Sequence, residues 1–205
     1  MVRKFFSCIF IVALGVAATA TGAAAQETQG PGAVEVTVIP AGAAYVAAKE
    51  KAPSFGNYGF GSAVTFTLNR VIGIEGEVSS LLATTSDLQF GDLDNHTKAP
   101  NLLSYTGNVI ISIPIADGVR PYAAGGIGGL TMFERPGVGV TKDTNFLTGN
   151  VGGGIKWYAP NNRWGIRGDY RFAATKSNDS APMFFGHEAR YIHRVYARVI
   201  INTAR

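Results

Sequence analysis

The sequence predicts an all-β fold, an eight-stranded antiparallel up-and-down β-barrel that spans a membrane. Four observations lead to this prediction. After Pro31, apolar and polar residues alternate with a period of two in eight segments, which is typical of β-strands with two different faces. The connections between these segments are long and short in turn, and aromatic residues gather toward both ends of the segments. Beyond the N-terminal segment no apolar stretch reaches the roughly 18 residues of a membrane-spanning helix, so a membrane-spanning chain of this kind must close into a barrel.

The N-terminal segment has the three parts of a secretory signal peptide: two basic residues, an apolar run at 5–16 and small residues at 23–25. The apolar run is short for a membrane-spanning helix. We therefore expect residues 1–25 to be a signal peptide and residues 26–205 to form the barrel domain. The single cysteine, Cys8, lies inside the signal peptide, so the exported chain has no disulfide framework.

The eight predicted strands are each about as long as the roughly 9–11 residues of a tilted transmembrane strand, or slightly longer. They lie at residues 34–45, 58–69, 71–82, 102–115, 120–133, 146–158, 163–173 and 190–201. The tight connections carry turn-forming residues and lie at 69–70, 116–119 and 159–162. The longer, polar connections lie at 46–57, 83–101, 134–145 and 174–189. Because the strand number is even and a long connection comes first, we expect both termini on the short-turn side, which faces the periplasm in barrels of this kind.

Charged residues fall on one parity of several predicted strands, opposite apolar residues. In a membrane barrel the apolar parity faces lipid and the polar parity faces the lumen. We therefore predict a charge network in the lumen made of Glu75, Glu77, Lys156, Arg167, Asp169, Arg171, Arg194 and Arg198. In the glycine-rich segment PYAAGGIGGLTMF, the sequence does not show which residues face lipid and which face the lumen.

Aromatic residues form two bands that flank aliphatic mid-strand positions, as in the interfacial girdles of membrane barrels. The predicted girdle includes Tyr122, Trp157 and Trp164, with Tyr158, near the short turns, and Tyr58, Phe60 and Phe172 near the long loops. A soluble lipocalin-like binding barrel of the periplasm also alternates, but with its apolar side chains inside. The two bands favour the membrane barrel over this alternative.

Four motifs carry a resemblance to the outer membrane protein A-like family of eight-stranded transmembrane barrels: FGSAVTFTLNRVIGIEGEVS at 60–79, VRPYAAGGIGGL at 119–130, NVGGGIKWYAP at 150–160 and GIRGDYRF at 165–172. The resemblance covers nearly all of the exported chain. It implies an integral outer-membrane protein of a Gram-negative-type cell, surrounded by outer-membrane lipid and lipopolysaccharide. It also implies insertion by the barrel assembly machinery.

Two functional readings of the predicted lumen stay open. An eight-stranded barrel is just wide enough for its own side chains to fill, so paired charges would form a polar plug with a structural or surface role for the protein. The sharper alternative is a small or gated porin-like channel. The long loops could in addition bind a host or surface ligand, because loops on rigid scaffolds often carry recognition.

Other classes of function have little support. Without Arg3 and Lys4 the formal charge falls from +4 to +2 and no basic run is present, which argues against nucleic acid as a partner. The glycine runs lack the lysine and helix of a phosphate loop, and the histidines are not clustered, so we expect no cofactor and no metal site. A hydrolase site of His193 with Ser104 or Ser112 and Glu188 can be imagined, but no nucleophile motif surrounds either serine. We therefore expect no catalytic site.

Overall fold

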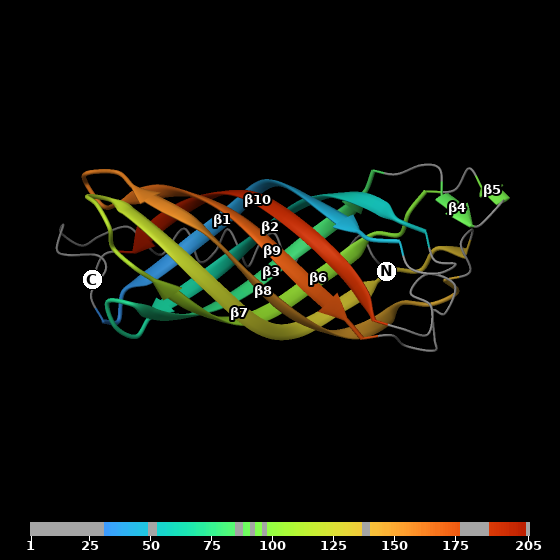
Figure 1. Ribbon diagram of the computed structural model, residues 1–205, viewed down its shortest axis with the longest axis horizontal. Coiled ribbons are helices and arrows are strands. Elements are labelled where there is room, and N and C mark those ends of the chain that lie inside the picture. Colours follow the sequence, from blue (N-terminus) through green and yellow to red (C-terminus); the bar gives the residue numbers. More distant parts are fainter. Residues whose placement is uncertain are drawn as a thin grey trace.

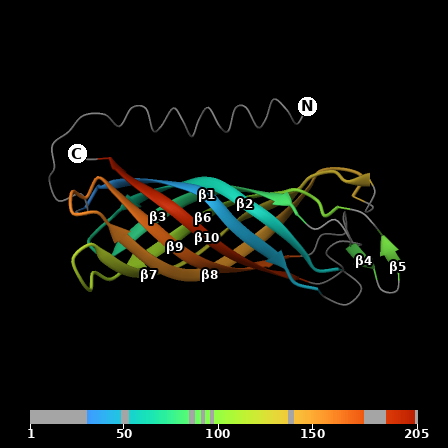
Figure 2. The same ribbon diagram turned by 90° about the horizontal axis from the view of Figure 1, so that it is seen from above.

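The described residues of the computed structural model form a closed antiparallel barrel of eight strands (Figures 1 and 2). The structure describes residues 31–48, 53–84, 88–90, 93–95, 98–136, 140–176 and 189–203, so the expected signal peptide lies outside it. The barrel strands are β1 (Val34–Val46), β2 (Phe55–Thr67), β3 (Ile72–Ala83), β6 (Leu102–Ser112), β7 (Val119–Met132), β8 (Thr144–Tyr158), β9 (Trp164–Thr175) and β10 (Arg190–Thr203). The predicted fold class is confirmed. No helix within the described residues is long and apolar enough to cross a membrane.

Each barrel strand pairs with the strands before and after it along the barrel, and β10 returns to pair with β1. The barrel therefore has no free strand edge, which removes the aggregation risk of an open sheet. One irregularity occurs in β1, where the register shifts between Val38 and Ala41. Pro40 lies at this point and has no N–H to give to the strand ladder, so a bulge is the natural place for it.

The two ends of the barrel differ in their connections. At the short-turn end, the Asn69 side chain accepts hydrogen bonds from the backbone N–H groups of Val71 and Ile72, and Gly118 and Asn162 adopt positive φ angles of 74° and 52°. These are the turn residues that such conformations favour. β1 starts and β10 finishes at this same end (Figure 1). We call the opposite end, with the longer connections, the long-loop end.

A short hairpin corrects the prediction that residues 83–101 form only a loop. β4 (Leu88–Phe90) pairs with β5 (Leu93–Asn95) in a separate two-stranded sheet. Figures 1 and 2 show it beyond the barrel at the long-loop end. The hairpin could not be predicted because the surrounding segment is polar and each strand has only three residues, too few for a visible alternation.

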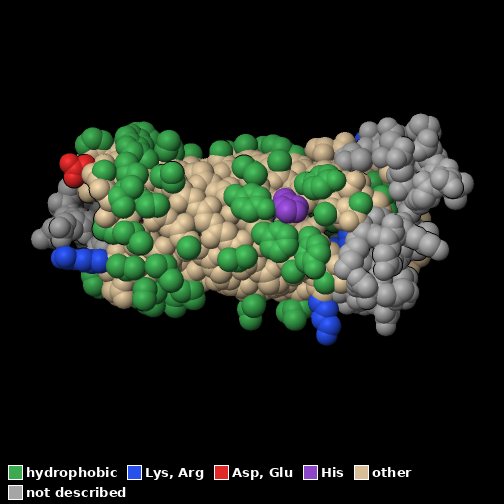
Figure 3. Space-filling model, viewed as in Figure 1, with side chains coloured by type: hydrophobic (Ala, Val, Ile, Leu, Met, Phe, Trp, Pro, Cys, Tyr) green, Lys and Arg blue, Asp and Glu red, His purple; other side chains and the backbone are tan. Residues whose placement is uncertain are grey.

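The outer wall is apolar between the two ends. Side chains such as Ile74, Val109, Val151, Ile166 and Val195 are exposed there, while their strand neighbours point inward. In the view of Figure 3, basic and acidic side chains lie only toward the ends of the barrel. The structure also gives the glycine-rich β7 its faces, with Tyr122, Ala124, Leu130 and Met132 pointing inward.

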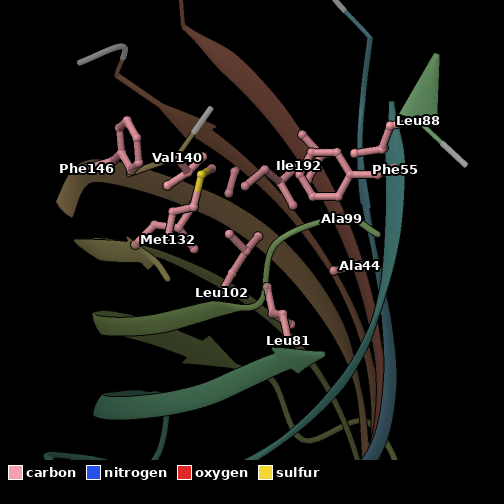
Figure 4. Close-up of a cluster of buried hydrophobic side chains, with 13 residues drawn as sticks. Ala44, Phe55, Leu81, Leu88, Ala99, Leu102, Met132, Val140, Phe146 and Ile192 are labelled. Atoms are coloured by element: carbon pink, nitrogen blue, oxygen red, sulfur yellow. The ribbon is translucent and has the colours of Figure 1, made fainter. Parts of the chain in front are cut away.

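Buried apolar side chains close the lumen at the long-loop end (Figure 4). This mouth cluster consists of Ala44, Val46, Phe55, Leu81, Leu88, Ala99, Leu102, Leu130, Met132, Val140, Phe146, Ala173 and Ile192. Most members are inward residues near the strand ends, and three come from outside the barrel strands: Leu88, Ala99 and Val140. The burial of Leu88 from β4 attaches the β4–β5 hairpin to the barrel mouth.

Candidate functional site

Charged side chains line the middle of the lumen because successive residues of a strand point to opposite faces. In β9, the sequence WGIRGDYRFAAT places Arg167, Asp169 and Arg171 on the inward face. All three residues are buried, with at most 5% of their surface exposed. Together with residues of three other strands they form what we call the lumen network: Glu75, Glu77, Tyr122, Arg167, Asp169, Arg171 and Arg198.

Glu75 is the main acceptor of the lumen network. Its carboxylate accepts hydrogen bonds from Arg167 Nη1 at 2.5 Å and from Arg171 Nη2 at 2.9 Å. Asn108 Nδ2 donates at 3.2 Å and Thr65 Oγ1 at 3.4 Å. Because these donors come from β9, β6 and β2, one buried carboxylate connects β3 to three other strands.

Asp169 is the second acceptor. Its four donors are Tyr122 Oη at 2.7 Å, Arg198 Nε at 3.0 Å, Arg167 Nη2 at 3.1 Å and Arg171 Nε at 3.2 Å. Arg198 also donates from Nη1 to Glu77 at 2.8 Å, and Arg167 Nε donates to the Tyr122 hydroxyl at 2.6 Å. The network is therefore continuous from β3 through β9 to β10.

Lys156 makes a separate pair nearer the short-turn end. Its Nζ lies 2.6 Å from Glu35 Oε2, and the Tyr158 hydroxyl donates to Glu35 Oε1 at 2.6 Å. All three residues are buried. Glu35 was not among the predicted lumen residues, because no faces were assigned to the first strand. The alternation in VEVTV is the signal that could have identified it.

Arg194 differs from the other predicted lumen charges. Its Nη1 donates to Ser104 Oγ at 3.0 Å, but within the described part of the chain it has no ion-pair partner. Its Nε atom is buried without a hydrogen-bond partner in that part. Two of its neighbours are apolar members of the mouth cluster: Ile192, the next inward residue of β10, and Ala44, its partner on β1. Its partner on β9 is Arg171, a second cation, and not a carboxylate.

The electrostatics of the lumen follow from this pairing. A buried charge is costly unless a partner of opposite charge and further hydrogen bonds compensate for the lost water. Glu75 and Asp169 each face several guanidinium groups, so the network is closely compensated. Among the residues that are described, Arg194 is compensated only by a hydroxyl group. The lumen can therefore hold fixed charge in a narrow space and neutralise most of it internally.

The predicted girdle needs two corrections, at Tyr122 and at Tyr158. Tyr58, Phe60, Trp157, Trp164 and Phe172 lie on the outward face, and the rings of Trp157 and Trp164 meet edge to face at 5.6 Å. The prediction for Tyr122 was wrong, because this residue is only 6% exposed and its hydroxyl belongs to the lumen network. The glycines of β7 gave no apolar alternation from which its face could be read. Tyr158, also grouped with the girdle, points inward to Glu35.

His193 and Ser104, two residues of the imagined hydrolase site, do not come together. His193 lies on the outward face, where the Tyr170 hydroxyl is 2.7 Å from its Nδ1 atom. Ser104 lies on the inward face of β6 and binds Arg194. Glu188, His96 and His187 lie outside the described residues. Among the residues that are described, no three His, Cys, Asp or Glu side chains are grouped so as to hold a metal ion.

A comparison with protein-family models matches residues 10–189 to the outer membrane protein beta-barrel domain. The chain belongs to this family. It is therefore a β-barrel protein of the bacterial outer membrane, and the resemblance inferred from the sequence motifs is confirmed. A comparison with curated protein sequences gives no match.

Solved structures share the fold at low sequence identity. Neisserial surface protein A is 13% identical with a TM-score of 0.58, and the likeness covers 82% of this chain and 96% of that one. The N-terminal β-barrel domain of OprF from Pseudomonas aeruginosa is 14% identical with a TM-score of 0.50, covering 85% of this chain and 99% of that one. At this level of identity the likeness concerns the fold alone.

Proposed function

We propose that the protein is a closed, non-conducting barrel with a structural role in the outer membrane. The observation that carries this proposal is the lumen network, whose charged members come from β3, β9 and β10 and are at most 5% exposed. An ion crossing the lumen would have to displace ion pairs that already satisfy one another. The barrel provides little other space, because eight strands enclose only enough room for side chains.

Two further layers support a sealed lumen. The mouth cluster lies between the lumen network and the long-loop end. An apolar constriction of this kind opposes the passage of hydrated ions. The Glu35–Lys156 pair lies on the other side of the lumen network, toward the short-turn end. A gated porin-like channel would require all three layers to rearrange together.

Conductance of the refolded full-length protein in a planar bilayer tests the proposal. We expect no discrete current steps from the wild type. Glu75→Gln and Arg167→Gln should then give traces like the wild type or only rare, irregular openings, since the other two layers remain. Regular current steps in the wild type that change in size with either substitution would establish the channel alternative instead. Arg163→Gln, at an exposed short-turn position, is the matched control.

A second role, recognition at the long-loop end, is supported by the way that end is built. Leu88, Ala99 and Val140 come from the connections between barrel strands, yet they are buried in the mouth cluster. The connections are thereby fixed to a rigid base, and loops held on rigid scaffolds are suited to binding a partner. Most of the long connection at 174–189, residues 177–188, lies outside the described residues.

Adhesion or ligand capture can be tested with loop-trimmed proteins. Cells that display the full chain should bind a host-cell or matrix surface better than cells in which a short Gly-Ser linker replaces residues 84–100. A chain with the same linker in place of residues 113–118, at the short-turn end, is the control for folding and display. Equal binding by the full and loop-trimmed chains would count against a role for the β4–β5 hairpin in adhesion.

The orientation of the barrel belongs to the same proposal. We infer that residues 1–25 are removed as a signal peptide, that the assembly machinery inserts the barrel among outer-membrane lipid and lipopolysaccharide, and that both termini face the periplasm. The position of β1 and β10 at the short-turn end supports this orientation. An epitope tag after the last residue should be inaccessible to antibody on intact cells, and a tag within residues 177–188 should be accessible.

A further inference from the structure

A polar pocket opens at the short-turn end of the lumen. It occupies about 330 Å³, including space that is open to solvent, and strands β1, β2, β3, β6, β7 and β8 contribute to its wall. Its more exposed lining includes Arg70, Arg120, Thr67 and Ser112. Its buried lining includes the Glu35–Lys156 pair and Tyr158, together with Thr65, Gly73 and Ile110. The lumen network is a separate set of residues.

The carboxylate in this pocket is already used. One oxygen of Glu35 accepts from Lys156 and the other from the Tyr158 hydroxyl, both at 2.6 Å. Among the described residues that line the pocket, Glu35 is the only acidic one. Its charge is balanced by Lys156, so the two arginines of the lining add an uncompensated positive charge.

Arg70 and Arg120 make no ion pair within the described residues, unlike Arg167, Arg171 and Arg198 in the lumen network. Arg120 is half-buried, and its guanidinium lies 6.0 Å from the centre of the Tyr158 ring. This ring contact limits where the guanidinium can lie without occupying its hydrogen-bond donors. Its five N–H groups make no hydrogen bond to any described residue, so they are available to a ligand in the pocket.

We infer that this pocket binds an oxyanion, either a carboxylate or a phosphate group of a small solute or polymer at the short-turn side. A guanidinium group matches both oxyanions with two parallel hydrogen bonds, and its charge makes those bonds stronger than neutral ones. The Thr67 and Ser112 hydroxyls, half-buried in the same lining, can add neutral donors. Both carboxylate oxygens of Glu35 already accept hydrogen bonds, so this residue at the bottom of the pocket does not compete for the arginines.

Anion titrations of the refolded full chain in lipid nanodiscs test the inference. Inorganic phosphate and acetate are titrated separately at constant pH and at ionic strength held constant with chloride, by calorimetry and by the backbone amide NMR signal of Gly73, which lines the pocket. We expect saturable binding of at least one of the two. Arg120→Gln and Arg70→Gln should each weaken it about tenfold or more, because each removes charge-assisted hydrogen bonds. Binding of phosphate alone or of acetate alone identifies which group the site takes.

The matched control is Arg163→Gln, which removes the same charge from the same end of the barrel outside the pocket lining. Its affinity should stay within about twofold of the wild type, since its charge is exposed and screened. Absence of saturable binding of both anions overturns the inference, as does equal weakening by Arg163→Gln, which would indicate general charge attraction. Each variant is first checked for the heat-dependent gel shift of a folded barrel. If Arg120→Gln does not fold, Arg120→Lys, which keeps the charge but loses the paired donors, should still bind more weakly than the wild type.

Discussion

Arg167 and Glu75 come from opposite walls of the barrel and meet in its middle, with Arg167 Nη1 2.5 Å from Glu75 Oε2. They are 92 residues apart in the sequence. Three strands separate β9 from β3 in either direction around the barrel. The hydrogen-bonded strand ladder holds only neighbouring strands together. A contact between opposite walls also fixes the cross-section of the barrel, so the lumen network should contribute to stability beyond the strand pairing.

Replacing Glu75 by glutamine should destabilise the barrel strongly. The variant leaves Arg171 and Arg167 in a buried site with one carboxylate fewer, and breaking a buried pair by removing one partner costs about 3–5 kcal/mol. The free energy of unfolding can be measured by urea titration in lipid vesicles, with the fluorescence of the outward Trp157 and Trp164 as the signal.

The control for Glu75→Gln is Asp117→Asn in an exposed turn, which should change the unfolding free energy by less than about 0.5 kcal/mol. The double variant Glu75→Gln with Arg167→Gln should be less destabilised than the sum of the single variants, because contacting residues are coupled. An unfolding curve for Glu75→Gln that overlays the wild type would show that the lumen network contributes nothing to stability.

Tyr122→Phe distinguishes a lumen residue from a girdle residue. The hydroxyl of Tyr122 bonds both Asp169 and Arg167, and hydrogen bonds to charged groups contribute about 1.5–3 kcal/mol each. We expect a loss of at least about 1.5 kcal/mol of unfolding free energy. Tyr105→Phe, on the outward face, is the control and should be nearly neutral. A girdle position for Tyr122 would give the two variants similar, small effects.

The strands and most of their faces could be predicted because alternation is a local property of the sequence. Glu75 and Glu77 show their direction through their neighbours Ile74 and Val78. Which inward charges meet is not local, because it depends on the register of all eight strands. Glu75 pairs with Arg167 and Arg171 of β9, but Glu77, two residues further along the same strand, pairs with Arg198 of β10.

The residues that sequence reasoning missed lie where alternation is weak. Tyr122 precedes a run of alanines and glycines, so its face could not be read from its neighbours. Glu35 is the single charge of its strand. In the pocket at the short-turn end, Arg70 of a turn comes close to Arg120 at the start of β7. The two residues are brought together only when the barrel closes.

Two neighbouring glycines of the wall should respond in opposite ways to alanine. A Cβ atom at Gly126 of β7 would collide with the backbone oxygen of Gly107 of β6, which cannot move without disturbing the ladder. We expect Gly126→Ala to cost about 1–3 kcal/mol, as overpacking does. A Cβ atom at Gly107 meets nothing within 4 Å, so Gly107→Ala should be neutral or stabilise by about 0.4–1 kcal/mol through the unfolded chain. The folded fraction on a heat-dependent gel and the urea midpoint measure both. Equal losses in the two variants would contradict the steric explanation.

Arg194→Met and Arg198→Met compare two inward arginines on one strand. Arg198 bonds Asp169 and Glu77, and its removal leaves two buried carboxylates short of a partner, which should cost about 3–5 kcal/mol. Arg194 is bonded to Ser104 alone among the described residues and adjoins the mouth cluster, so methionine replaces a poorly compensated charge by an apolar side chain of similar length. We expect Arg194→Met to leave the unfolding free energy unchanged or to raise it, because exchanging a poorly compensated buried charge for a well-packed apolar group is often stabilising. Urea unfolding of both variants under identical conditions decides the comparison. A loss in Arg194→Met as large as that in Arg198→Met would mean that Arg194 has a compensating partner, and that the charge of the lumen is balanced as far as the mouth cluster.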